Sequence, residues 1–182
     1  MLRPTRTQID AEIVDRAAAL FARHDFEHTS LQQIADAVGY SKAGLLHHFP
    51  SKKALYDAVI DALRAHIEAM AAAVRALPVG IERDRAVVEA SIDFAFERPG
   101  ISALSNRIAV NPDPENEELT AIGFVMYEAL GIDLANLEMD RLVRVTSAFA
   151  GLGVTAGIAV QSKLSKEWRG LIAAAAMDAL GH

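Results

Sequence analysis

Apolar side chains recur at three- and four-residue steps along nearly the whole chain, and this periodicity is the feature that most restricts the fold. In residues 8–24, one such face consists of Ile9, Ile13, Ala17, Leu20 and Phe21. No run of four to eight residues alternates apolar with polar, and no Asn-Gly or Asp-Gly pair marks a hairpin turn. The sequence therefore predicts an all-α protein.

Capping residues divide the periodic pattern into about nine helices, of which the first three form a small head and the rest a larger bundle. Ser30, Ser41 and Ser51 stand where N-caps are expected, and Gly39 suits a left-handed helix exit. The predicted helices cover residues 8–24, 31–38, 42–49, 52–76, 82–97, 101–110, 114–130, 138–162 and 165–180.

Composition narrows the class of protein. The 182 residues suffice for one compact core or for a small head on a larger body. The absence of cysteine excludes disulfides and thiolate zinc sites. The N-terminal residues lack the apolar stretch of an export signal. The longest apolar segment, residues 145–160, is too short to span a bilayer and contains hydroxyl side chains, which favours a buried helix. We therefore expect a soluble, cytoplasmic protein.

The formal net charge is -6, and the charged residues are distributed unevenly along the chain. Residues 1–56 hold seven Lys/Arg and six Asp/Glu, whereas residues 57–182 hold eleven and eighteen. The head is thus less acidic than the body, which permits local binding of an anion there.

The segment "GYSKAGLLHHFPSKKAL", residues 39–55, predicts a short open helix. On a helical wheel at about 100° per residue, Leu45, Leu46 and Phe49 gather on one side. The other side is expected to expose Ala43, Gly44, His47 and His48. Two short helices joined by a tight glycine turn, with the second lying open, form a helix-turn-helix whose second helix enters the DNA major groove.

The residue types of this segment suit DNA chemistry. Small side chains at Ala43 and Gly44 allow close approach to the bases, and Lys42 can donate to a guanine edge or a phosphate. His47 and His48 can donate to phosphate oxygens. After Pro50, the next helix N-terminus carries exposed N–H groups and two lysines, which together predict a second phosphate anchor formed by Ser51, Lys52 and Lys53.

The stretch "TSLQQIADAVGYSKAGLLHHFPSKKALYDAVI", with the amphipathic helix before it, resembles the DNA-binding head of the tetracycline-repressor (TetR) family of transcriptional regulators. The resemblance covers roughly residues 7–60. It implies a DNA-binding domain over residues 1–50 and a helical ligand-binding and dimerisation domain over residues 51–182. The implied protein is a homodimeric repressor without enzymatic activity or cofactor. It binds double-stranded operator DNA, an inverted repeat, and a small-molecule effector releases it.

The resemblance also implies roles for individual residues. Base- or backbone-facing positions are Gln32, Lys42, Ala43, Gly44 and His47, while phosphate positions are Ser30, His48 and Lys52; Ser41 and Lys53 complete the predicted DNA-binding set. Two residues depart from the family pattern. Gly44 stands where a threonine is common, and Leu46 stands where a tyrosine usually reaches a phosphate.

Other interpretations remain open from the sequence. His47 and His48 as metal ligands lack the i, i+4 spacing that gathers ligands on one helix face. A small helical enzyme using His47, His48, His66, Asp57 or Asp61 lacks an activated nucleophile with an oxyanion site. A ligand-independent activator is equally compatible with the head. Arg3 and Arg6 fit either a minor-groove arm or a disordered tail.

The body offers candidates for a ligand pocket that also suit an ordinary core: Met70, Phe94, Phe124, Tyr127, Phe149 and Trp168. No buried charge constellation marks the ligand as an ion or an acid. Gly153 and Gly157 form a pattern of small residues four apart that permits close helix contact, either within the chain or, as we prefer, at a dimer seam.

Overall fold

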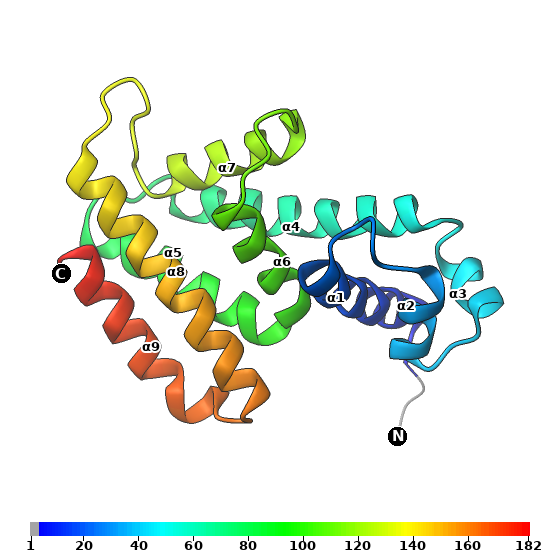
Figure 1. Ribbon diagram of the computed structural model, residues 1–182. Helices are drawn as coiled ribbons and strands as arrows, with labels where there is room; N and C mark the ends of the chain where they lie inside the picture. The colour runs from blue at the N-terminus through cyan, green and yellow to red at the C-terminus, as the bar shows by residue number, and fades with distance from the viewer. Residues whose placement is uncertain (1–3) are drawn as a thin grey trace.

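A computed structural model describes residues 4–182, and within this range the chain forms nine α-helices and no strand (Figure 1). The helices are α1 (Arg6–His24), α2 (Leu31–Val38), α3 (Lys42–His48), α4 (Lys52–Val74), α5 (Ile81–Glu97), α6 (Pro99–Val110), α7 (Glu117–Ala129), α8 (Met139–Gln161) and α9 (Ser165–Leu180). The predicted all-α fold is confirmed.

Local capping interactions explain where the head helices begin and end. The side chains of Ser30, Ser41 and Ser51 each accept a hydrogen bond from the backbone N–H three residues later, at 3.2, 3.0 and 3.0 Å. Gly39 has φ 72° and ψ 26°, the left-handed conformation predicted for it. The first helix starts earlier than predicted, at Arg6, because Thr5 accepts from the N–H of Gln8.

Two apolar cores meet along α4, which runs from the head at one end of the molecule into the body (Figure 1). Leu55 and Val59 pack with the head helices, whereas Met70 and Val74 pack with α5, α8 and α9. The head core also includes Ile101, Leu104 and Ile122 from α6 and α7. The predicted boundary after residue 50 therefore falls at the start of a helix that both cores share, and it stays a prediction.

A close joint between α1 and α6 seats the head on the body. The N–H groups of Gly100 and Ile101 both donate to Asp15 Oδ1, at 2.9 and 3.0 Å. The α6 N-terminus has no side-chain cap of its own, so a carboxylate of α1 caps it and complements the helix dipole. Gly100 is buried so close to α1 that a Cβ atom would lie 1.8 Å from the carbonyl oxygen of Asp15.

Helix α8 has two different faces. It has 23 residues and so extends beyond the predicted apolar segment 145–160, and it is the one helix in residues 4–182 that is long and apolar enough to cross a membrane by length and composition. Val145, Leu152 and Ala156 on one face are buried against α5 and α9, as in the core helix of a globular body. On the other face Val154 and Ile158 are 63% and 45% exposed, so this chain alone leaves an apolar stripe uncovered.

Candidate functional site

The outer surface of the helix-turn-helix is formed by four exposed residues of α3: Lys42, Ala43, Leu46 and His47. They recur at one- and four-residue steps, which places them on one side of the helix. Within the described chain, the Lys42 amine and the His47 ring form no hydrogen bond or ion pair that would hold them against the protein. This surface therefore presents two groups able to donate hydrogen bonds, flanked by small and apolar side chains.

The predicted orientation of α3 was wrong at two positions. Leu46 was placed on the packed side but is 37% exposed, and His48 was placed on the open side but turns inward. The His48 Nδ1 atom lies 2.5 Å from Asp10 Oδ1 of α1, and its ring meets Tyr40 edge-on. The inward positions are Leu45, His48 and Phe49, again at helical spacing, so the seven-residue helix is rotated by about one position from the prediction.

The neighbours of Gly44 leave little room for a side chain at this position. A Cβ atom at this residue would lie 3.3 Å from both Ser41 Oγ and Tyr40 Cδ1. Ser41 Oγ accepts the hydrogen bond from the Gly44 N–H and so caps α3. The absence of a side chain thus fits the entry of the helix, and close approach to DNA stays a prediction for this residue.

The N-terminus of α4 lies beside α3, but its two lysines already have partners. The Lys52 amine donates to the carbonyl oxygen of Phe26 at 2.8 Å and stands 4.3 Å from the centre of the Phe26 ring, a cation–π arrangement. Lys53 pairs with Asp57 at 2.7 Å on the solvent side of α4. Lys52 consequently ties the recognition region to the loop after α1, and Lys53 is the more exposed cation.

At the start of α2, the predicted contact residues are exposed and internally hydrogen-bonded. Ser30 and Gln33 form a reciprocal capping box, with distances of 3.2 and 2.8 Å. Gln32 donates to Asp36 Oδ1 at 2.7 Å, one turn further along the same helix. Their roles toward phosphate and base remain predictions.

Arg6 and Asp10 are parts of the head surface whose placement only the fold reveals. Arg6 is the first residue of α1, and its guanidinium donates to the carbonyl oxygen of His47 at 3.5 Å. It is therefore not part of a free arm, while Arg3 lies outside the described residues. No sequence signal links Asp10 to His48, which lies 38 residues away.

A cavity of about 310 Å³, open to solvent on one side past the exposed Val110 and Val154, lies in the body between α4, α5, α6, α7 and α8. Four of the six predicted pocket residues line it: Met70, Phe94, Tyr127 and Phe149. Phe124 instead points outward with 52% of its surface exposed, and Trp168 of α9 packs against the body core. The cavity also has a polar strip on α6 that the spacing of aromatic side chains did not indicate: Ser102, Ser105 and Asn106.

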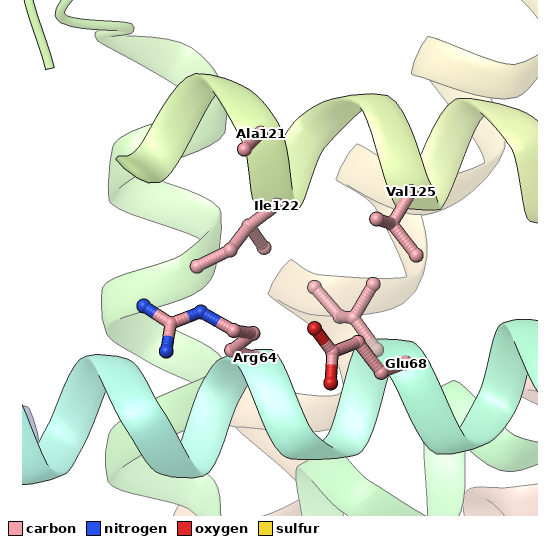
Figure 2. Close-up of a pocket in the computed structure, with 6 residues that line it drawn as sticks. Arg64, Glu68, Ala121, Ile122 and Val125 are labelled. Carbon is pink, nitrogen blue, oxygen red and sulfur yellow. The ribbon is translucent and has the colours of Figure 1, made fainter. Parts of the chain in front are cut away.

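A second, much smaller hollow lies between α4 and α7 (Figure 2). Arg64 and Glu68 reach from α4 toward Ala121, Ile122 and Val125 of α7, and the volume is about 60 Å³. Small-molecule sites typically measure about 300–1,000 Å³. Only the larger cavity therefore has the size of an effector site.

His66 forms part of the cavity wall, with its ring stacked on Phe94 at a centroid distance of 3.7 Å and an interplanar angle of 9°. Burial lowers the pKa of His66 because desolvation disfavours the charged imidazolium. Asp57 and Asp61, which an enzyme was expected to combine with this histidine, pair instead with Lys53 and Arg64. Among residues 4–182, no three His, Cys, Asp or Glu side chains gather as metal ligands.

Gly153 and Gly157 of α8 lie four residues apart but have different surroundings. A Cβ atom at Gly153 would lie 2.3 Å from the Asn106 amide nitrogen, whereas one at Gly157 would meet nothing within 4 Å. The preferred interpretation of a shared dimer seam is therefore wrong for Gly153, which serves packing within the chain. Gly157 stays available to a partner.

The fold and the geometry of α2 and α3 define a class: helix-turn-helix transcriptional regulators that bind DNA through a three-helix head. The family model for "Bacterial regulatory proteins, tetR family" matches residues 13–59, which span most of α1 to the first third of α4. Residues 13–59 therefore carry a DNA-binding domain of the tetR type, as the resemblance of residues 7–60 implied.

Individual relatives match over different lengths. The transcriptional repressor KstR2 of Rhodococcus jostii is 28% identical over 162 residues, covering 82% of this chain and 77% of that protein. The regulator RutR of Escherichia coli is 48% identical over 48 residues, only 26% of this chain and 23% of that protein.

Two solved structures share the fold over nearly the full length. PfmR, a TetR family regulator from Thermus thermophilus, aligns with a TM-score of 0.54 at 22% identity and covers 98% of this chain and 96% of its own. The probable transcriptional regulatory protein RHA5900 aligns with a TM-score of 0.56 at 21% identity, covering 98% and 100%. At these identities the likeness establishes the fold alone.

Proposed function

We propose that the protein is a homodimeric transcriptional repressor that a small molecule, bound in the larger cavity of the body, releases from operator DNA. The observation that carries this proposal is the double role of α6. One face of α6 lines the cavity through Ser102, Ser105 and Asn106. The N-terminus of the same helix is held by Asp15 of α1. A ligand that displaces α6 therefore displaces the head relative to the body.

The exposed faces of α8 and α9 support the homodimer. Val154 and Ile158 on α8, and Leu171 on α9, are exposed by 63%, 45% and 68%, beside open glycines at Gly151 and Gly170. Exposed apolar side chains on two helices that pack together favour an interface, and small residues let two helix pairs approach closely. A two-fold axis through this surface pairs the two heads for an inverted repeat.

Repression, rather than activation, is supported by the similarity, over 82% of this chain, to a protein named as a transcriptional repressor. The protein then acts in the cytoplasm by binding alone, without turnover. The dispersed positions of His47, His66 and Asp57 agree with that mode of action.

Operator selection from random duplex DNA with the purified protein tests the proposal. We expect inverted repeats with recognition helices about 34–36 Å apart, or a multiple of that spacing. Sedimentation should find a dimer at micromolar concentration, and a metabolite panel should contain a compound that releases the selected DNA. Asymmetric sites, or a monomer at that concentration, would contradict the dimeric repressor.

A further inference from the structure

We propose that the cavity takes an uncharged, mainly apolar ligand whose hydrogen-bonding oxygen atoms lie along one edge. This inference rests on the proposed role of the cavity as the effector site. It concerns the chemistry of the ligand and not the direction of regulation.

The first support is the absence of fixed charge. None of the described residues that line the cavity is Asp, Glu, Lys or Arg. The one imidazole in the wall belongs to His66, and burial lowers its pKa, so near neutral pH it is uncharged. An ionised ligand would give up part of its hydration there without gaining a counter-charge, which weakens its binding.

The second support is a polar edge on α6, where three polar side chains lie together. The other helices contribute single polar groups: His66, Ser91, Tyr127 and Thr146. Ser102, Ser105 and Asn106 occur at steps of three and four residues, so they lie on one face of α6 and all line the cavity. Their side chains form no hydrogen bond with any residue in the range 4–182. When a ligand displaces water from this wall, these groups need new partners, since an unpaired buried polar group is costly.

Asn106 is the best-positioned member of this edge. Its amide lies against the backbone of α8 at Gly153, where even a Cβ atom would collide with it at 2.3 Å. Ser91 offers a contrast within the same cavity, because its hydroxyl already donates to the carbonyl oxygen of Val87 at 2.8 Å. Asn106 is therefore available to a ligand, and Ser91 is internally satisfied.

The remaining walls require an apolar body. α4, α8 and the end of α7 contribute mostly aliphatic and aromatic side chains, among them Leu63, Met70, Met126, Leu130, Val145 and Phe149. A ligand that buries apolar surface against these segments and turns its oxygen atoms toward α6 matches both kinds of lining. The cavity therefore favours ligands whose oxygen atoms lie along one edge and can face α6.

Equilibrium dialysis of the full-length protein at pH 7.5 tests this with four naphthalene probes of similar shape. They are 2-methylnaphthalene, 2-naphthol, 2-naphthoate and (naphthalen-2-yl)methylammonium. We expect 2-naphthol to bind most tightly, with both ions at least tenfold weaker. An ion that binds as tightly as 2-naphthol, or failure of all four probes to bind, would overturn the proposal.

Variants locate the polar edge. Asn106→Leu should weaken 2-naphthol by about two- to tenfold while leaving 2-methylnaphthalene unchanged or tighter. Ser91→Ala, a matched control on α5 in the same cavity, should change neither. Should Asn106→Leu fail to fold, Asn106→Asp replaces it and should shift preference toward the ammonium probe. Equal binding of 2-naphthol by wild type and Asn106→Leu, or an unshifted preference in Asn106→Asp, would remove Asn106 from the ligand edge.

Failure of the ligand class and failure of the proposed function are separable. A protein that binds selected operator DNA and is released only by a charged metabolite keeps the function and loses the class. A protein that binds the neutral probes but no duplex DNA keeps the class and loses the function.

Discussion

Substituting Gly100 by alanine should separate the head from the body at their closest contact. The added Cβ atom would lie 1.8 Å from the carbonyl oxygen of Asp15 and 3.0 Å from the backbone nitrogen of Ala19. An ordinary carbon–oxygen contact is about 3.3 Å, so α6 must move away from α1 by about 1.5 Å. The colliding atoms belong to a helix backbone, which cannot rotate aside as a side chain can.

The expected loss in the free energy of unfolding follows from two costs and one gain. Overpacking costs about 1–3 kcal/mol. The shift also stretches the hydrogen bonds from Gly100 and Ile101 to Asp15 Oδ1, and such bonds to a charged acceptor are worth about 1.5–3 kcal/mol each. Alanine gains at most about 1 kcal/mol over glycine in a helix. We expect a net destabilisation of about 3 kcal/mol.

Urea unfolding followed by circular dichroism, at one fixed protein concentration, measures this difference. Gly123→Ala in α7 is the control, because a Cβ atom there meets nothing within 4 Å, and it should stabilise by about 0.5–1 kcal/mol. Operator affinity should fall in Gly100→Ala and stay unchanged in the control. If both variants gain stability alike, α1 and α6 do not meet as described and the proposed route from cavity to head fails.

Four further outcomes are expected. Lys42→Ala should cost about 1–3 kcal/mol on a selected operator and less on random DNA, and equal losses in a mobility-shift titration would make Lys42 a backbone anchor. Leu171→Glu should convert a dimer to a monomer in sedimentation, so an unaffected dimer would exclude the α8–α9 surface. Asp84→Asn should lower the free energy of unfolding by about 3–5 kcal/mol in urea, because the buried Asp84 Oδ1 pairs with Arg141 Nη2 at 2.6 Å. A loss below about 1 kcal/mol, as at an exposed ion pair, would refute that. Burial lowers the pKa of His66, so just below about pH 6.5 the folded state binds fewer protons than the unfolded state. The free energy of unfolding should therefore fall as pH falls through that range. A His66→Phe variant with the same pH dependence as wild type in thermal unfolding would contradict this.

Local chemistry explains why the head was predictable from the sequence. An N-cap joins a side chain to a backbone N–H only three residues away. The helix starts after Ser30, Ser41 and Ser51 are therefore determined by short stretches of sequence. Gly39 likewise specifies its own left-handed turn. Helix order, the helix-turn-helix and the all-α fold were therefore determined before any tertiary contact was known.

Only the tertiary structure determined which side of α3 packs against the rest of the head. Neighbouring positions on a seven-residue helix differ by about 100°, and two adjacent leucines followed by two histidines fit more than one rotation. The contact of His48 with Asp10, 38 residues away, sets the rotation and turns Leu46 outward.

The joint and the cavity depend on the same kind of distant partner. Asp15 and Gly100 meet across 85 residues, and Asn106 gains its place from the close approach of α8 at Gly153. Periodicity states that a residue lies on a helix face, but it does not state which neighbour covers that face. In the sequence, Ser102, Ser105 and Asn106 of α6 therefore look like an ordinary polar helix face, and only the packing of the surrounding helices makes them line a cavity.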